Sequence, residues 1–291
     1  MQKEKIFITG GSGFLARHLV EYFKKKNKFE IHVLDKKIKH KIKNVNYHKI
    51  NILDLKKLKK VISKNSTVYH FAAISDIEHA NRDHLSAINV NINGTVNVLE
   101  ACKENQVKKI IFASSIYSMS ELGGFYSSTK FSSELLIERY SKKFKLNYII
   151  IRFGSLYGKY SDTTNTITNL VNQAWKNNKI IRNSDGKEIR NYINAVDAVK
   201  LCYNFHKSSY KNKYFNLIGT KKMTIKRVIL IISKIFNLKK ISFKPKHKDD
   251  YHYKINPYTF KLRKGIFIKP KNEIKFTKGI SDLVKFIQNA R

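Results

Sequence analysis

Along the first 160 residues, short apolar runs alternate with longer segments in which apolar positions recur at helical spacing. The run at 6–8 is typical of a strand covered on both faces, and the stripe at 14–23 is typical of a helix. Further strands are predicted at 30–34, 45–51, 67–71, 109–113 and 147–153, and further helices at 54–62, 86–103 and 126–143. Strands that alternate with helical crossovers predict an α/β fold, a Rossmann-type doubly wound parallel sheet.

A glycine-rich turn joins the first predicted strand to the first predicted helix. It contains Gly10 and Gly13, where the backbone turns sharply before the helix begins. A helix start exposes unpaired N–H groups and the positive end of a dipole, so the turn predicts a pyrophosphate site. Asp35 ends the second strand about 20 residues later, where a carboxylate accepts from a ribose 2′-hydroxyl and repels a 2′-phosphate. This favours NAD over NADP, although Lys36 and Lys37 soften the preference.

The pattern changes after Gly158. Helices are predicted at 163–177, 194–206, 224–236 and 281–289, with short strands at 188–193 and 214–217. The prolines Pro245, Pro257 and Pro270 fall in a stretch that we expect to be irregular. We therefore expect an NAD-binding domain over 1–160, to which about 186–206 return, and a smaller, mainly substrate-binding lobe over 161–291.

The net charge of +37 has two interpretations. Such a charge is typical of proteins that bind nucleic acid or anionic membranes. It also results from a drift of composition toward Lys, Asn and Ile. The drift of composition is the favoured interpretation, because the lysines are spread over many segments. At 54–62, for example, they lie on the solvent-facing side of a predicted helix whose other side is apolar. We therefore expect no nucleic-acid partner, although the charge attracts anionic substrates.

The two cysteines, Cys102 and Cys202, lie in predicted helices with no metal-ligand spacing around them. They indicate small buried hydrophobes in a reducing cytoplasm, and no metal site is expected. No apolar run approaches the ~20 residues of a membrane span, and the start of the chain does not resemble a signal peptide.

Candidate chemistry lies at Tyr126 and Lys130, which share one face of a predicted helix because they are four residues apart. Tyrosine has an ordinary pKa of about 10 and is a poor base, but a nearby lysine and an oxidised nicotinamide would both favour the phenolate. Ser115 follows a predicted strand and would hydrogen-bond the same substrate oxygen. The order of strand, serine, tyrosine and lysine behind a dinucleotide turn predicts a site that moves a proton and a hydride.

These segments resemble the extended short-chain dehydrogenase/reductases, and within them the NAD-dependent epimerase/dehydratase family, such as the UDP-glucose 4-epimerases. The resemblance rests on segments 9–16, 70–73, 93–95, 112–115, 126–130, 152–158 and 186–197, with Asp35 and 216–219. It implies an enzyme of nucleotide-diphospho-sugar metabolism, used in polysaccharide synthesis. It also implies a homodimer, formed by the helices at 86–103 and 126–143.

The resemblance implies roles by position. For NAD these are Gly10, Gly13, Phe14 and Leu15 at the pyrophosphate, Asp35 at the ribose, Asn51 and Ile52 near the adenine, and Ala72 along the cofactor. The catalytic set would be Ser115, Tyr126 and Lys130, with Lys130 also holding the nicotinamide ribose. The substrate would meet Ser75, Ser115, Ser155 and Arg190, the last of which would pair with the diphosphate.

Several positions depart from the family pattern. Ala16 replaces the third glycine of the turn, and Ser155 stands where many members carry Asn. The interval between Ser115 and Tyr126 is short for the family, so the loop that would cover the substrate is shorter than in other members. Ile116 and Tyr117 replace the acidic pair that related 4,6-dehydratases use to eliminate water.

These departures favour an epimerase that works through a transient keto-sugar, with Tyr126 as base. A sugar-nucleotide dehydrogenase or reductase and a 4,6-dehydratase stay open as alternatives. A third hypothesis, from another class, is a basic nucleic-acid-binding module that keeps the NAD fold.

Overall fold

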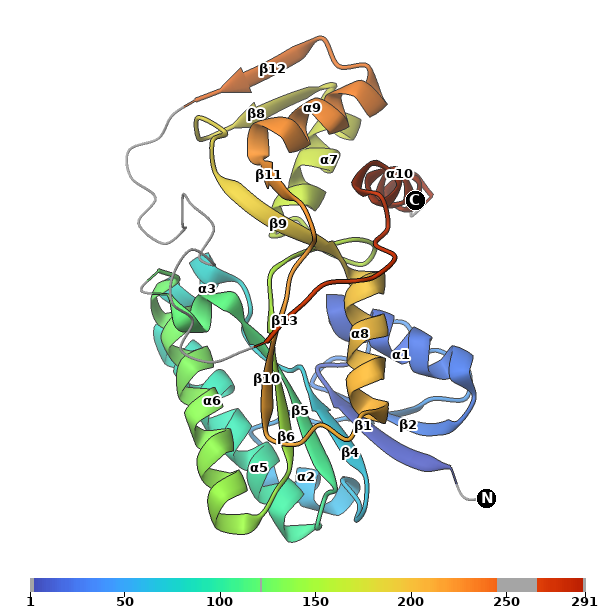
Figure 1. Ribbon diagram of the computed structural model, residues 1–291, viewed down its shortest axis with the longest axis vertical. Coiled ribbons are helices and arrows are strands. Elements are labelled where there is room, and N and C mark those ends of the chain that lie inside the picture. The colour runs from blue at the N-terminus through green and yellow to red at the C-terminus, as the bar shows by residue number, and fades with distance from the viewer. Residues whose placement is uncertain (1–2, 121, 245–265, 290–291) are drawn as a thin grey trace.

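The computed structural model describes residues 3–120, 122–244 and 266–289. Its centre is an eight-stranded sheet, in which every neighbouring pair of strands is parallel (Figure 1). The strands in spatial order are β13 (Ile266–Ile268), β10 (Lys213–Leu217), β6 (Tyr148–Phe153), β5 (Lys109–Ser115), β4 (Thr67–His70), β1 (Glu4–Thr9), β2 (Phe29–Asp35) and β3 (Asn46–Lys49). The order reverses direction between β1 and β4, which confirms the predicted Rossmann-type α/β fold.

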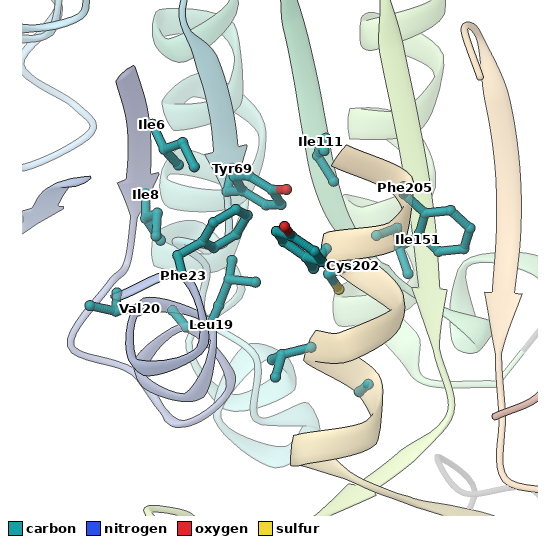
Figure 2. Close-up of a cluster of buried hydrophobic side chains, with 14 of the residues drawn as sticks. Ile6, Ile8, Leu19, Val20, Phe23, Tyr69, Ile111, Ile151, Cys202 and Phe205 are labelled. Carbon is teal, nitrogen blue, oxygen red and sulfur yellow. The ribbon is translucent and has the colours of Figure 1, made fainter. Parts of the chain in front are cut away.

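Helices cover both faces of this sheet. Helices α1 (Phe14–Lys26) and α8 (Ala195–Lys207) pack on one face, and α2 (Leu55–Val61), α5 (Gly94–Glu104) and α6 (Gly124–Phe144) pack on the other (Figure 1). Successive side chains of a strand point to opposite faces, so β1 sends Ile6 and Ile8 to the first layer and Phe7 to the second. Figure 2 shows the first layer, where Phe23 of α1 and Cys202 of α8 meet Tyr69 of β4.

A smaller lobe lies beyond the carboxyl ends of the central strands (Figure 1). It contains a three-stranded sheet of β7 (Ser155–Tyr157), β9 (Ile189–Asn194) and β11 (Lys222–Thr224), and the strand pair β8 (Lys179–Arg182) and β12 (Lys240–Phe243). Helices α7 (Thr166–Asn177), α9 (Ile225–Phe236) and α10 (Phe276–Gln288) complete its core. The described chain passes between the lobes four times, at β6–β7, β9–α8, β10–β11 and β13–α10.

Some predicted elements differ from the observed ones. The helix predicted at 86–103 is three pieces, α4 (His84–Ile88), a π-helical turn (Asn89–Asn93) and α5, and it is preceded by the short helix α3 (Ile77–Arg82). The last helix begins at Phe276 rather than at 281. The earlier start was not predicted because the N-cap residue, Lys275, makes no side-chain cap that the sequence could reveal. Pro245 and Pro257 lie outside the described residues. None of the described helices is long and apolar enough to span a membrane.

Candidate active site

The glycine turn after β1 is held in a conformation that requires glycine at its first position. Gly10 has a φ of +68°, and a Cβ built on it would lie 2.7 Å from the backbone of Ala72. Its N–H donates to the carbonyl of Leu34 at 2.8 Å, and its carbonyl accepts from the N–H of Gly13 at 2.9 Å. The turn therefore packs directly on the backbone that follows β4, with no side chain between them.

Helix α1 starts from this turn with its amino end free of side-chain caps. The N-cap is Gly13, which makes no side-chain cap, and the first helical turn carries no acidic residue. The first N–H groups of an α-helix have no partner within the helix. The turn and the helix start, including Phe14 and Leu15, thus form a cradle of backbone donors that fits a pyrophosphate.

Asp35 closes this cradle from the end of β2. Its carboxylate accepts from the N–H of Ser12 at 3.0 Å and from the N–H of Lys37 at 3.1 Å. The glycine turn and the acid are therefore held together, as a ribose next to a pyrophosphate requires. Asn51 is exposed, whereas the Ile52 side chain is buried and contacts Gly94, so an adenine could meet only the backbone at that position.

A buried chain of hydrogen bonds supports the turn from below. His70 Nδ1 lies 2.8 Å from Thr9 Oγ1, and His70 Nε2 lies 2.9 Å from Thr95 Oγ1. Thr9 Oγ1 also accepts from the N–H of Ala72 at 3.3 Å. Burial lowers the pKa of His70 to about 3, and the charge of Lys130 acts in the same direction. The imidazole therefore stays neutral at physiological pH and links β1, β4 and α5.

Acidification is expected to destabilise the protein through His70. The unfolded chain binds a proton near pH 6.5, whereas the folded chain binds it only near pH 3, so this stabilisation is full above pH 6.5 and is lost as the pH falls toward 3. Between pH 7 and pH 5 the loss is about 2 kcal/mol. Urea unfolding at both pH values should show this loss in the wild type and a smaller one in His70→Asn. Equal losses in both proteins would contradict the assignment.

The candidate catalytic residues come from β5 and α6. Tyr126 and Lys130 are buried on successive turns of α6, and the Asn81 side chain of α3 accepts from the N–H of Phe125 at 2.9 Å in the first turn of that helix. Ser115, at the end of β5, lies near enough to the Tyr126 hydroxyl to influence its pKa. Lys130 Nζ donates to the carbonyl of Ala113 in the same strand at 2.9 Å. The fold therefore brings the three residues together at the carboxyl end of the sheet.

The pKa values of this group are governed by burial. Burial raises the pKa of Tyr126, against a smaller lowering by the hydrogen bond with Ser115. In the chain without NAD, the desolvation of a phenolate outweighs its neighbours, and the predicted favouring of the phenolate includes the charge of a bound nicotinamide. Burial lowers the pKa of Lys130 to about 8, and the carboxylate of Glu134 opposes this shift. Lys130 is thus largely protonated at neutral pH.

The residues predicted to meet a substrate lie apart in the fold. Ser75 is exposed on the segment after β4, and Ser155 is partly buried in β7. Arg190 is partly buried in β9, opposite Met223 of β11, and its Nη1 donates to the carbonyl of Ile189 at 2.9 Å. Ser75 and Ser155 thus follow the carboxyl ends of β4 and β6, whereas Arg190 belongs to the three-stranded sheet of the smaller lobe.

Sequence reasoning missed the polar side chains that hold the site together. Asn91, in the π-helical turn, exchanges hydrogen bonds with the backbone of Ile74 and donates to Thr129 Oγ1 of α6 at 3.0 Å. Glu134 of α6 and Arg152 of β6 form a buried ion pair beneath Ser115. The available signal was the position of Asn91 and Glu134 in helices that must pack on a sheet, where an unpaired polar residue would be costly.

Comparison with known proteins identifies the family. Residues 6–217 match the NAD dependent epimerase/dehydratase family. A putative UDP-glucose 4-epimerase of Methanocaldococcus jannaschii is 26% identical over 98% of both chains. A dTDP-D-glucose 4,6-dehydratase of Dictyostelium discoideum is 31% identical over 67% of this chain and 54% of that protein.

Solved structures show the same fold over the whole chain. The UDP-N-acetylglucosamine 4-epimerase of Methanobrevibacter ruminantium, in complex with UDP-N-acetylmuramic acid, superposes with a TM-score of 0.86 at 21% identity over 100% of both chains. A UDP-glucose 4-epimerase of Thermus thermophilus in complex with NAD has a TM-score of 0.81 at 20% identity, over 99% of this chain and 100% of that one. The match of residues 6–217 to the family, together with the glycine cradle and the parallel sheet, shows that the chain belongs to the NAD-dependent epimerase/dehydratase family.

Proposed function

We propose that the protein is an NAD-dependent epimerase of a nucleotide-diphospho-sugar. The observation that carries the proposal is the grouping of Ser115 with Tyr126 and Lys130, which lie one helical turn apart, at the carboxyl end of the sheet. Relatives of the chain include both epimerases and dehydratases. Epimerisation is favoured over dehydration because the residues after Ser115 are Ile116 and Tyr117, which cannot supply an acid and a base for elimination of water.

The residues of the chain divide the work. Tyr126 takes the proton of the sugar hydroxyl and later returns it, while Ser115 donates a hydrogen bond to the same oxygen. Lys130 keeps a positive charge beside them and holds the nicotinamide ribose. NAD⁺, held by the glycine turn and by Lys130, would supply the acceptor for the hydride of the sugar carbon and the donor that returns it. Burial of the site strengthens each of these electrostatic interactions, since little water competes.

The same proposal assigns the binding residues. Gly10 and Gly13 form the turn that leaves room for the pyrophosphate, Phe14 and Leu15 offer it the free backbone N–H groups of the helix start, and Asp35 binds the adenosine ribose. Asn51 and the backbone at Ile52 lie at the adenine, and Ala72 lies along the cofactor. Ser75, Ser155 and Arg190 bind the sugar nucleotide. The free helix start and the glycines that leave room for a ligand support the pyrophosphate assignment.

Asp35→Asn is expected to weaken NAD⁺ binding about 10- to 100-fold, because a charged acceptor for the ribose hydroxyls is lost. Binding of NADP⁺ should weaken less or improve, since the repulsion of a 2′-phosphate is removed and Lys36 and Lys37 remain. Calorimetric titration with both dinucleotides measures the change. Asp185→Asn, which removes an exposed acid of the other lobe, is the control. An unchanged preference in Asp35→Asn would contradict the ribose role.

Arg190→Ala is expected to raise KM for the sugar nucleotide about 10- to 100-fold with a smaller effect on kcat, because a charged contact to the diphosphate is lost in both ground and transition states. Arg182→Ala is the matched control, since Arg182 lies in the same lobe but is paired with Glu188. Initial rates over a range of substrate concentrations separate the two constants. Equal KM values in both variants would contradict the role of Arg190.

The test of the function is an NMR assay of purified protein with UDP- and GDP-sugars. An epimerase gives two sugar isomers at equilibrium with no net change in nicotinamide absorbance. The alternatives, a dehydrogenase or a reductase, consume or form NADH stoichiometrically, and a 4,6-dehydratase releases a keto-deoxy-sugar. Either of these results would replace the epimerase assignment.

Two partner assignments stay proposals. We infer a homodimer through α5 and α6, supported by the exposure of the apolar residues Phe125, Leu135 and Phe144 on α6. A measurement of the molecular mass in solution tests it.

A nucleic-acid partner is not favoured, because exposed lysines occur in both lobes and over both faces of the sheet rather than in one patch. Salt-dependent binding of RNA or DNA without sugar-nucleotide turnover would reverse this judgement.

A further inference from the structure

The largest fully buried side chain of the described protein belongs to Arg152, and it is paired with a buried acid. Arg152 Nε donates to Glu134 Oε1 at 2.9 Å, and Arg152 Nη2 donates to Glu134 Oε2 at 2.6 Å. Both side chains are at most 2% exposed. A buried ion pair costs much desolvation and adds little to stability compared with apolar residues of the same size. Its presence directly beneath a catalytic site therefore suggests a task other than stability.

The carboxylate of Glu134 also accepts hydrogen bonds from two serine hydroxyls of the segment that contains Ser115. Ser114 Oγ donates to Oε1 at 2.5 Å, and Ser118 Oγ lies 2.8 Å from the same oxygen. Ser118 Oγ is also 2.7 Å from the carbonyl of Ser115. The residues on both sides of Ser115 are thus fastened to α6, the helix that carries the tyrosine and the lysine.

Glu134 also lies one helical turn beyond Lys130. It is the charged group that opposes the effect of burial on the lysine. The other titratable groups near Lys130 are Tyr126 on the same helix and His70 on β4, and both are neutral at physiological pH. The ring of Phe112 on β5 faces the ammonium at 4.9 Å and carries no charge. Glu134 is therefore the negative charge that the described structure places behind Lys130.

We propose that Glu134, anchored by Arg152, is a positioning residue of the active site, which fixes the Ser115 segment against α6 and keeps Lys130 cationic. The proposal rests on the proposed function for its effect on turnover, but not for its effect on Lys130. Arg152 is needed because a lone buried carboxylate would take up a proton, and because its two parallel bonds fix the carboxylate plane. The guanidinium is itself held over the ring of Tyr214 at 4.6 Å.

The test compares Glu134→Gln with Glu138→Gln. Glu138 lies one turn further along the same helix and accepts from Tyr214 Oη at 2.7 Å, so the control removes the same charge away from Ser115. Protein with ¹³C-labelled lysine is titrated by NMR, and the Lys130 signal is the one missing from Lys130→Met. We expect a midpoint near pH 8 in the wild type, a lower midpoint in Glu134→Gln and no change in Glu138→Gln. An unchanged midpoint in Glu134→Gln would overturn the proposal.

The kinetic readout is separate. With a sugar nucleotide that the wild type converts, Glu134→Gln should lower kcat about 10- to 100-fold with little change in KM, as small displacements of catalytic groups do. The alkaline limb of the pH profile of kcat should also move to lower pH, and an unmoved limb would overturn the proposal. If the wild type converts no sugar nucleotide, the proposed function fails while the titration still decides the role of Glu134.

A second variant guards against misfolding, because Glu134→Gln leaves Arg152 as a buried unpaired charge. The double variant Glu134→Leu/Arg152→Met replaces the whole pair with apolar side chains and is expected to fold. A positioning role predicts that its kcat stays low and that its Lys130 midpoint stays below that of the wild type. Recovery of both to wild-type values would show that the pair is only structural.

Discussion

Tyr126→Phe should lower kcat for the sugar nucleotide by about 10²- to 10⁴-fold and leave the fold and NAD⁺ binding intact. The magnitude is that of a lost general acid and base, since phenylalanine cannot carry the proton. The ring packs with Ala80 and Ala87 and remains in place, because only the hydroxyl is removed. The loss should appear in kcat and in kcat/KM alike, as it does when an interaction of the transition state is removed.

The matched control for this result is Tyr140→Phe, which removes a tyrosine hydroxyl about four turns further along the same helix, α6. Tyr140 Oη donates to Glu100 at 2.6 Å, and its ring lies next to Phe144 rather than Ser115. Its kcat should stay within about twofold of the wild type, because a surface hydrogen bond contributes only modestly. A Tyr126→Phe protein that turns over as fast as Tyr140→Phe would refute the proposed chemistry.

Gly10→Ala is expected to reduce NAD⁺ affinity at least about 100-fold and to lower the stability of the protein. Alanine at a φ of +68° costs about 1–2 kcal/mol, and its Cβ would lie 2.7 Å from the Ala72 backbone, which cannot rotate away as a side chain could. The turn must therefore shift, and the donors that face the pyrophosphate shift with it. Calorimetric titration with NAD⁺ and thermal unfolding measure the two effects.

The control variant is Gly186→Ala in the smaller lobe. It shows how much of the Gly10→Ala effect comes from backbone strain alone and how much from distortion of the pyrophosphate cradle. Gly186 has a similar φ of +73°, but a Cβ there would meet the ring of Phe243, a side chain that can move. This variant should lose a comparable amount of stability and bind NAD⁺ as the wild type does. If both variants bind NAD⁺ normally, the glycine turn is not the pyrophosphate site.

The parallel sheet could be predicted because its signals are local. The apolar run at 6–8, the glycines after it and the acid at Asp35 lie within 35 residues, and each follows from strand or turn chemistry. The helix predicted at 224–236 is α9, which Thr224 caps by accepting from the N–H of Arg227 at 3.1 Å. Strands such as β11 and β13 were missed, since three residues are too few to show a period.

The support of the site could not be predicted in the same way, because it depends on contacts between distant segments. In the sequence, Glu134 is indistinguishable from the other polar residues of its helix, and its partner Arg152 lies 18 positions later on a strand. The π-helical turn that directs Asn91 toward Ile74 has no local sequence signal. The extent to which burial raises the Tyr126 pKa could not be predicted either, since burial depends on the whole fold.

The four passages that the described chain makes between the lobes have a mechanical consequence. They are joined by hydrogen bonds: the N–H of Gly154 after β6 donates to the carbonyl of Leu217 at 2.8 Å, Asn191 of β9 donates to the carbonyl of Gly219 after β10 at 2.8 Å, and Asp197 of α8 accepts from the N–H of Ile274 at 2.9 Å. Gly219 also has no room for a side chain against the carbonyl of Tyr192. A hinge works when one or two strands bend freely, whereas here the four described connections would have to bend together. The two lobes should therefore keep a fixed spacing, so that side chains at their junction, rather than closure of the lobes, would select the substrate of the proposed reaction.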